Sequence, residues 1–565
     1  MTDATGNSYL NLIEPNFLQS IELRKGPQGG EFGSESGGVV VLNSINKDEI
    51  KTNISGGSYN MFTEKINFGK KIGKHFLQIG QSHYQSDGYR EQSKIKRTSF
   101  IVKNNWKYNQ INELKFLLLY TDLDYQTPGG LTLQQMRNNP RQARLATSTL
   151  PSVIEQNAAI RNKTILGGIA HVWKINENWK QFTMLQSSFT DFKNPFISNF
   201  EIRDEKNFQG RMYLDYSKEL NNIKLNTRIG IEAGINKTDF NNYDNNAGIK
   251  GNPQKFDQLK STTTFYYLAQ HLELKNKLFI DASLSLNTMQ YNWTTTFPLN
   301  DNGAKSFKNQ LLPQIGVNYK LNSTLSLRGK IAKGFSSPTT EEVRSSNQEI
   351  QSNLSAEHGW NKEIGIRKNL KSIFVELTAF NYNLKDAIVK RQDENGNDYF
   401  INAGGTKQQG LEISIESNKF KFNHPIFNGY NFILTGHFYD FKYNNYQVGL
   451  NNFSNNKLPG ISKYSVQNLI ELRLFNLIDL QYSNYYNSSL YLNDANSVKE
   501  KDYIIGNLLI NSDLKIRKSN LNLYFGINNL YNTKYSAGYD LNAFGNRYYN
   551  PAATRNFYIG MKIIL

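Results

Sequence analysis

The chain has 565 residues, no cysteine and a formal net charge of +17. The lack of cysteine excludes a disulfide framework and a thiolate metal site. A basic balance suits nucleic acid, a membrane surface or an anionic ligand. The Lys and Arg residues are spread along the chain without the clustered stripe of nucleic-acid-binding proteins, so we expect no nucleic-acid partner.

The hydropathy of the chain leaves two classes open. No run approaches the roughly 18 apolar residues that a membrane helix needs. The mean hydropathy of −0.58 would ordinarily favour a water-soluble protein. A transmembrane β-barrel, however, hides its apolar face in alternation and gives a much weaker signal per segment. Hydropathy alone therefore predicts either a soluble protein or an outer-membrane barrel.

The first predicted element is a strand, a tight turn and a second strand over residues 21–42. A basic pair and a Gly-Pro step precede a glycine-dense segment and the apolar run VVVL (39–42). Proline cannot donate to a sheet ladder, and glycine permits positive φ and close backbone approach. An ordinary Gly-rich hairpin is the alternative interpretation. The motif residues are Arg24, Gly26, Pro27, Gly33, Gly37 and Gly38.

Further along the chain, long segments alternate between apolar and polar residues. Residues 223–235 carry apolar side chains, with one threonine, at odd positions and polar side chains or glycine at even positions. This period of two predicts a strand with one apolar face, long enough to cross a bilayer at a tilt. Similar patterns occur at 411–416, 520–528 and 557–565.

The spacing of these segments separates a barrel from a soluble sandwich. Short links such as 70–74 and 221–224 alternate with long polar connections, which is typical of outer-membrane barrels. We predict an all-β fold, a transmembrane antiparallel β-barrel of about 22 strands in the class whose lumen is plugged. The long polar connections are expected at 123–160, 237–259, 291–308, 334–358, 388–403, 443–463 and 530–553.

Several motifs resemble those of TonB-dependent outer-membrane receptors. IELRKGPQGGEFGSESGGVVVL resembles the end of their plug domain, and SDGYR (86–90) resembles an extracellular-loop signature. Loops 125–144 and 334–344 are similar to those of the ferric-dicitrate subgroup, and 548–565 resembles the last hairpin. The resemblance implies a plug remnant at residues 1–46 lying in the lumen of a barrel formed by residues 47–565.

Two features depart from the family pattern. The chain opens MTDATGNSYL, without a signal peptide, and ends at Leu565 where the family usually has an aromatic residue. The family also carries an N-terminal coupling box, on which the TonB-ExbB-ExbD complex pulls, and a longer plug. Without that box we expect the chain as written to be truncated and not energised. Leu565 still continues the apolar face.

The resemblance implies a bacterial outer-membrane receptor, a monomer in the lipid bilayer, that takes up a ferric chelate such as ferric citrate. Arginine suits such an anionic ligand because its planar guanidinium pairs bidentately with carboxylates. Iron is expected only as part of the cargo, with no resident cofactor or metal. The candidate ligand-binding residues are His83 and the arginines expected in loops, which are Arg90, Arg137, Arg141, Arg144, Arg203, Arg344 and Arg391.

Other functions stay open at this point. A receptor of the same fold could import cobalamin, heme or a glycan, and a passive porin or structural surface barrel would share the alternating strands. The plug-like segment argues against a plain porin. An enzyme is not expected, because the sequence has no P-loop, no Gly-x-Ser-x-Gly and no zinc-ligand spacing of histidines.

Overall fold

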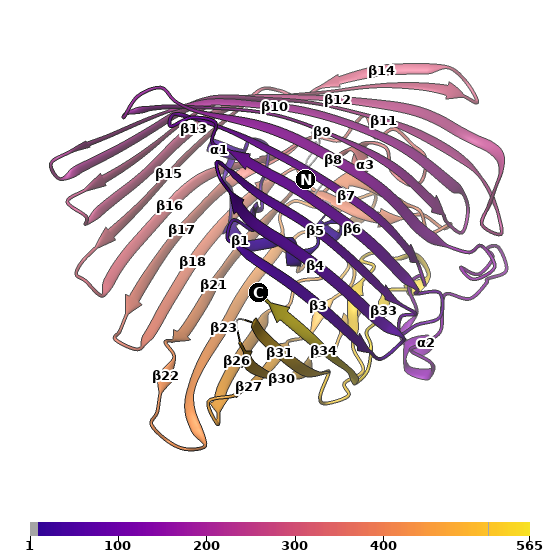
Figure 1. The fold of residues 1–565 in the computed structure, drawn as a ribbon. Helices are drawn as coiled ribbons and strands as arrows, with labels where there is room; N and C mark the ends of the chain where they lie inside the picture. Colours follow the sequence, from indigo (N-terminus) through magenta and orange to yellow (C-terminus); the bar gives the residue numbers. More distant parts are fainter. Residues whose placement is uncertain (1–9, 518) are drawn as a thin grey trace.

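The computed structural model describes residues 10–517 and 519–565 (Figure 1). These residues form a closed antiparallel barrel of 22 strands. β3 pairs with β4 on one side and with the last strand, β34, on the other, so the ring of described strands has no free edge. The all-β barrel predicted from alternation and spacing is confirmed.

The barrel strands follow one another around the ring in chain order. They are β3 (Glu49–Gly57), β4 (Met61–Ile72), β5 (His75–Ser86), β6 (Ile95–Trp106), β7 (Asn112–Gln126), β8 (Ala159–Lys174), β9 (Trp179–Pro195), β10 (Phe200–Leu220), β11 (Ile223–Asn246), β12 (Ile249–Leu274), β13 (Leu278–Phe297), β15 (Gln310–Lys320), β16 (Leu325–Ser336), β17 (Glu357–Asn369), β18 (Ile373–Lys385), β21 (Gly405–Ser417), β23 (Phe427–Tyr443), β26 (Tyr464–Leu474), β27 (Ile478–Asn487), β30 (Tyr503–Ile516), β31 (Ser519–Asn528) and β34 (Asn556–Ile564).

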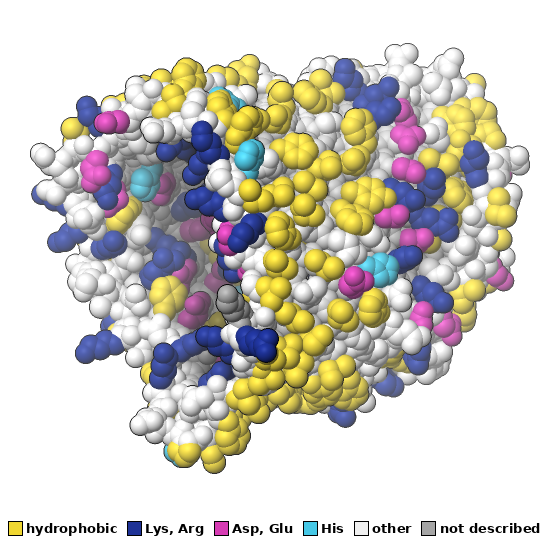
Figure 2. Space-filling view, in the orientation of Figure 1, with side chains coloured by type: hydrophobic (Ala, Val, Ile, Leu, Met, Phe, Trp, Pro, Cys, Tyr) yellow, Lys and Arg dark blue, Asp and Glu magenta, His cyan; other side chains and the backbone are white. Residues whose placement is uncertain are grey.

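Alternation along the strands separates an apolar outer face from a polar inner face. In β11, Ile229 and Ile235 are 57% and 43% exposed on the outside, whereas Asn236 and Thr238 are buried on the inside. Figure 2 shows hydrophobic side chains over the outer wall and charged side chains around a hollow on the same face. The outer face therefore suits hydrocarbon and the inner face a polar lumen.

The expected loop at residues 237–259 is wrong. β11 continues to Asn246 and β12 begins at Ile249, so only a two-residue turn joins them. The inward side chains of this extension, including Phe240 and Leu259, pack in a buried apolar cluster with Met289 and Tyr291 of β13. Many of its outward side chains, such as Lys237, Asp239 and Gln258, are polar, which is why the sequence there resembles a loop.

Short turns join the strands at one end of the barrel, and longer connections lie at the other. None of the helices in the described ranges has the length and hydrophobicity to cross a membrane. The additional elements are β14 (Asp301–Ser306), β19 (Ile388–Gln392), β20 (Asp398–Asn402), β22 (Phe420–Lys421), β24 (Gln447–Val448), β25 (Asn451–Asn452), β28 (Leu490–Tyr491), β29 (Lys499–Glu500), β32 (Ser536–Tyr539), β33 (Tyr549–Pro551), α2 (Leu133–Asn138), α3 (Thr340–Val343), η1 (Leu10–Leu12), η2 (Pro15–Phe17) and η3 (Phe544–Asn546).

The N-terminal segment lies inside the ring of strands (Figure 1). It comprises η1, η2, β1 (Leu18–Lys25), α1 (Gly29–Phe32) and β2 (Gly38–Ser44), with β1 and β2 paired as a separate two-stranded sheet. Its side chains contact β4 through Lys65 and β21 through Glu412, and α1 contacts β13. Because these strands are spread around the ring, the segment is enclosed by the wall.

Candidate functional site

The glycine-rich motif forms the hairpin that the sequence predicts. β1 and β2 are antiparallel, with Arg24 opposite Val39, and the Gly26 N–H donates to the Gly37 carbonyl at 3.1 Å. Gly26 has a φ of 65°, a conformation that favours glycine. The intervening residues form α1 rather than a plain turn. The expected strands on either side of the turn are confirmed.

The helix α1 is held on the inner wall by hydrogen bonds to its backbone and by one ion pair. Ser285 Oγ donates to the Gly29 carbonyl at 2.7 Å, and Arg211 Nη2 donates to the Glu31 carbonyl at 2.9 Å. The Glu31 carboxylate pairs with Arg228 at 3.2 Å. The wall is therefore shaped to bind the peptide backbone of this turn.

The contact at Gly30 leaves no room for a side chain. A Cβ there would lie 1.8 Å from Ser283 Oγ, whereas one at Gly37 would meet nothing within 4 Å. We expect Gly30→Ala to weaken the docking of α1 by about 1–3 kcal/mol, the usual cost of overpacking. Proteolysis of the N-terminal segment in the folded barrel would measure this.

Gly37→Ala is the matched control and should change the cleavage rate little. Adding Ser283→Gly to Gly30→Ala should restore protection, because it removes the side chain that the new methyl group would strike. Equal rates of proteolysis in the Gly30→Ala and Gly37→Ala variants would contradict this account of the contact.

A second anchor of the segment is the buried carboxylate of Glu14. It is fully buried and pairs with Lys65 at 2.8 Å and Arg97 at 2.5 Å. Ser82 Oγ also donates to it at 3.2 Å. Burial raises the pKa of Glu14, but the hydrogen bond and charge of Lys65, with help from Arg97, outweigh burial and hold the pKa below its usual range.

A pocket of about 900 Å³ opens at the long-loop end of the lumen, beside this anchor. Ile13 and Pro15 of the N-terminal segment and Arg97 of the wall contribute to its lining. Five tyrosines contribute aromatic faces and phenol hydroxyls to the lining, which suits a ligand with both flat and polar parts. The tyrosines of this pocket are Tyr59, Tyr84, Tyr89, Tyr125 and Tyr558.

In the loop layer, two arginines have no carboxylate within 4 Å among the residues that the structure describes. Among the described residues, neither Arg144 nor Arg547 forms an ion pair or a side-chain hydrogen bond, and Arg144 Nε and Arg547 Nη1 are buried without an acceptor. Burial, followed by the charge of Arg547, lowers the pKa of Arg144, and burial lowers that of Arg547. Unpaired, partly buried guanidinium groups are costly unless an anion binds them.

Two adjacent glycines allow the loops that carry these arginines to approach each other. A Cβ at Gly129 would lie 2.9 Å from the Arg144 Cβ, and one at Gly130 would lie 2.3 Å from the Arg547 carbonyl oxygen. The neighbouring Asp540 is half-buried, and burial raises its pKa. Its carboxylate compensates part of the charge of Arg144, because the charge of Asp540 raises the pKa of that guanidinium.

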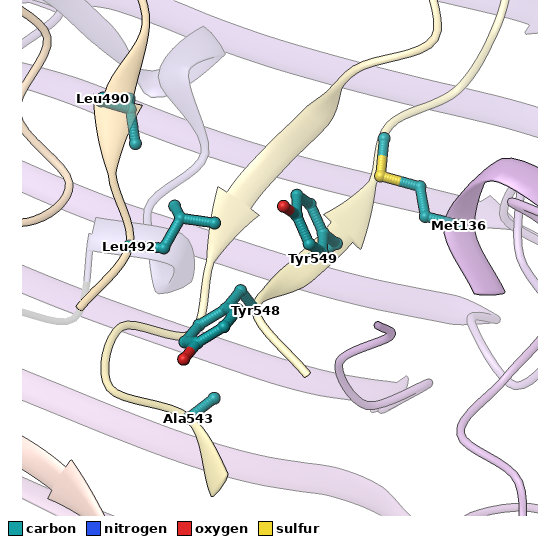
Figure 3. Close-up of a cluster of buried hydrophobic side chains, with 6 residues drawn as sticks. All are labelled: Met136, Leu490, Leu492, Ala543, Tyr548 and Tyr549. Carbon is teal, nitrogen blue, oxygen red and sulfur yellow. The ribbon is translucent and has the colours of Figure 1, made fainter. Parts of the chain in front are cut away.

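An apolar cluster fixes the same loops (Figure 3). Met136 of α2 lies near Tyr549 of β33, so the loop after β7 packs on the loop before β34. Because Arg547 precedes the buried Tyr548 and Tyr549, its backbone is held by this packing. The cluster consists of Met136, Leu490, Leu492, Ala543, Tyr548 and Tyr549.

The expected residues Arg90, Arg137 and Arg141 lie in this loop layer. Arg90 is buried and donates from Nη2 to the carbonyl of Gly129 at 2.7 Å, and burial lowers its pKa to about 10. Arg141 donates from Nε to the Tyr89 carbonyl at 3.1 Å, and Arg137 is in the last turn of α2. Arg90 and Arg141 thus join loops, whereas Arg144 is left with free donors.

Two further candidates have their charge satisfied inside the protein. Arg203 was expected in a loop but lies in β10, with its guanidinium 3.2 Å from Glu201 and 3.8 Å from the centre of the Phe192 ring. Arg344 is buried and pairs with Asp257 at 2.7 Å. The loop placement of Arg203 is wrong because its strand starts earlier than the polar sequence indicates.

Arg391 and His83 also have internal neighbours. Arg391 is in β19 and lies 3.6 Å from the buried carboxylate of Asp494. His83 is in β5, with Nδ1 3.0 Å from Thr98 Oγ1. Their roles in ligand binding stay predictions, as do those of the other candidates.

Sequence reasoning missed Arg547 and most of the pocket tyrosines. The sequence places Arg547 in the long connection 530–553, which marks it as a loop cation. Its proximity to Arg144 depends on the fold. Tyr84 and Tyr558 are strand residues whose place in the pocket depends on the curvature of the barrel. Among the described residues no group of three or more His, Cys, Asp or Glu side chains could hold a metal ion.

A barrel of this size that encloses a folded N-terminal segment belongs to the class of plugged outer-membrane transporters. The family model for the TonB dependent receptor-like β-barrel matches residues 43–530, and the chain belongs to that family. The sequence resemblance is thereby confirmed. Family members are receptors and transporters, and the fold implies a Gram-negative outer membrane.

Solved structures share this fold at low sequence identity. The unliganded ferric citrate transporter FecA matches with a TM-score of 0.81 and 16% identity, over 98% of this chain and 84% of that one. The siderophore receptor PiuA from Acinetobacter baumannii gives 0.77 and 14%, over 98% and 87%. The copper transporter OprC gives 0.78 and 13%, over 99% and 88%. At these identities the matches establish the fold alone.

Proposed function

We propose that this protein is an outer-membrane receptor for uptake of an anionic ferric chelate, such as ferric citrate or another carboxylate siderophore. The observation that carries the proposal is the pair Arg144 and Arg547, whose guanidinium groups lack partners among the described residues. Ferric chelates of this type are anionic and present carboxylate oxygens, which guanidinium groups bind bidentately.

The surroundings of the arginine pair support this assignment. Arg90 joins Tyr89, which lines the pocket, to Gly129, which touches Arg144, so the pocket and the pair are linked by one short chain of contacts. A chelate held by the arginines could rest its flat parts on the tyrosine rings. Burial strengthens such contacts, because water competes less for the charged groups.

We further propose that residues 1–46 act as a plug unit inside the barrel formed by residues 47–565. The hydrogen bonds to α1 and the Glu14 anchor support this division, because they hold the segment on the wall through separate contacts. As a member of its family, the receptor would work as a monomer in the lipid bilayer, and the TonB-ExbB-ExbD complex is the partner expected for the full-length receptors of the family.

Two alternatives make different predictions. A receptor for another ligand is supported by the copper transporter OprC, which has the same fold. A passive porin is disfavoured by the enclosed segment, which narrows the lumen. The two would differ in bilayer recordings, because a porin gives large steady currents and a plugged receptor does not.

The direct test is a binding titration with purified protein in detergent. Ferric citrate is the first probe, and cobalamin, hemin and a Cu(II) salt are the competitors. We expect saturable binding of ferric citrate that the competitors do not displace. Binding of only a competitor would replace the proposed ligand, and no binding together with a large bilayer conductance would favour the porin.

A further inference from the structure

Three neighbouring strands each place one lysine at the same level of the outer wall. Lys206 of β10 is directly opposite Lys237 of β11, which in turn is directly opposite Lys260 of β12. The strand neighbours Asn207, Asn236 and Ser261 are buried on the inner face, so alternation places the lysines outside. The three ammonium groups therefore share one patch of the barrel exterior, named here the lysine row.

The charges of the lysine row are not neutralised by the protein. Within the described residues no carboxylate lies within 4 Å of any of the three ammonium groups, whereas on β8 and β9 Lys163 pairs with Asp122 and Lys193 with Asp191. Like charges directly opposite each other on paired strands destabilise a sheet. An anion bound across the row would offset that cost.

The lysine row lies at the upper edge of the apolar band. One pleat below it, Phe208 and Ile235 are 53% and 43% exposed on the outer wall, and Tyr266 and Leu268 continue the band toward the short-turn end. Lys260 is fourteen residues from Leu274, the end of β12. At about 3.3 Å per residue and a tilt of about 45°, Lys260 lies roughly 33 Å above the short-turn end of β12. This height is near the border of the hydrocarbon core.

Acidic side chains lie on the far side of the row from the apolar band. Asp204 and Asp239 are directly opposite each other one pleat above the lysines, and Asp239 Oδ1 accepts a hydrogen bond from Gln258 at 2.7 Å. The order along the wall is thus apolar, basic and then acidic. This order matches a lipid whose chains lie along the band and whose anionic headgroup meets the lysines, and the acidic residues confine that headgroup to the row.

We propose that the lysine row binds the phosphate groups of a lipid in the surrounding leaflet. The three compact ammonium groups would take a phosphorylated headgroup, while the acyl chains pack on Phe208, Ile235 and the side chains below them. This site depends only on the barrel being in a membrane. It is separate from the proposed chelate site, so either can fail without the other.

The test uses purified full-length protein in dodecyl maltoside and native mass spectrometry. The probes are bisphosphorylated lipid A, the same lipid without its phosphates, and inorganic phosphate. The variant Lys206→Gln/Lys237→Gln/Lys260→Gln should bind bisphosphorylated lipid A at least tenfold more weakly than the unaltered protein. The lipid without phosphates should bind both proteins equally, and millimolar inorganic phosphate should not compete.

The matched control is Arg161→Gln/Lys163→Gln/Lys193→Gln, which removes three outward cations that pair with aspartates. It should change lipid binding less than threefold. An equal loss in both triple variants would mean attraction by net charge alone and would overturn the site, as would competition by free phosphate. If the first variant does not fold, the single variant Lys237→Gln is used instead. A loss of affinity for bisphosphorylated lipid A of less than twofold in that variant would overturn the proposal.

Discussion

The variant Arg144→Gln/Arg547→Gln is expected to bind ferric citrate about 100-fold more weakly than the unaltered protein, or weaker still. Each guanidinium would lose charge-assisted hydrogen bonds that contribute about 1.5–3 kcal/mol, and a tenfold change in affinity corresponds to about 1.4 kcal/mol. Calorimetric titration of the purified barrel measures the dissociation constant. The single variants should each lose about tenfold or more.

Arg161→Gln is the control, because Arg161 is on the outer wall and pairs with Asp124 at 3.5 Å. It should bind ferric citrate like the unaltered protein. Arg144→Lys should recover only part of the affinity, since lysine keeps the charge but cannot bind a carboxylate bidentately. Full affinity in the double glutamine variant would show that the ligand binds elsewhere.

The second large effect is expected at Glu14, where Glu14→Gln should release the N-terminal segment from the wall. Breaking a buried ion pair costs about 3–5 kcal/mol, because the partner charges are left uncompensated. Lys65 and Arg97 retain 26% and 18% of their side-chain exposure, so water screens part of that cost. We expect docking to weaken by about 2–4 kcal/mol, measured as faster proteolysis within residues 10–46 of the folded barrel.

Lys47→Gln is the control for this effect. Lys47 pairs with Glu49 at 2.8 Å but is 61% exposed, and exposed pairs contribute little. Its cleavage rate should match that of the unaltered protein. Equal cleavage of the Glu14→Gln and unaltered proteins would show that the other contacts of the segment, those of α1 and Lys25 among them, hold it without Glu14.

The Glu14 anchor should also depend on pH. Its pKa is lowered in the folded protein, so its contribution is complete above the unfolded-state pKa of about 4.3 and is lost as the pH falls through the lower folded value. Protection of the segment should therefore be constant from neutral pH to about pH 5 and decline only in stronger acid. Glu14→Gln should remove the decline that this group causes.

Much of the architecture could be read from the sequence because membrane strands follow a local rule. Alternation at 223–235 and 557–565 fixes which side chains face lipid, and each such face must be apolar wherever it is placed. The hairpin around Gly26 could be predicted for the same reason, since proline and glycine restrict the backbone locally.

The candidate site was less accessible to sequence reasoning. Arg90, Arg141 and Arg144 belong to connected motifs and could be chosen as loop cations, but the sequence does not distinguish the two that bind backbone carbonyls from the one with unpaired donors. Likewise, residues 237–259 read as a loop because the apolar contacts of Phe240 and Leu259 lie on β13, outside the segment.

The sequence by itself determined the barrel, its lipid-facing side chains and the plug-like hairpin, because each depends on neighbours within a few positions. Only the tertiary structure decided which charges remain free. Arg144 and Arg547 are 403 positions apart in the chain and the members of the lysine row come from three strands. Whether a charged side chain has a partner depends on ion pairing, burial and strand register. All three are set only when segments distant in the chain come together in the barrel.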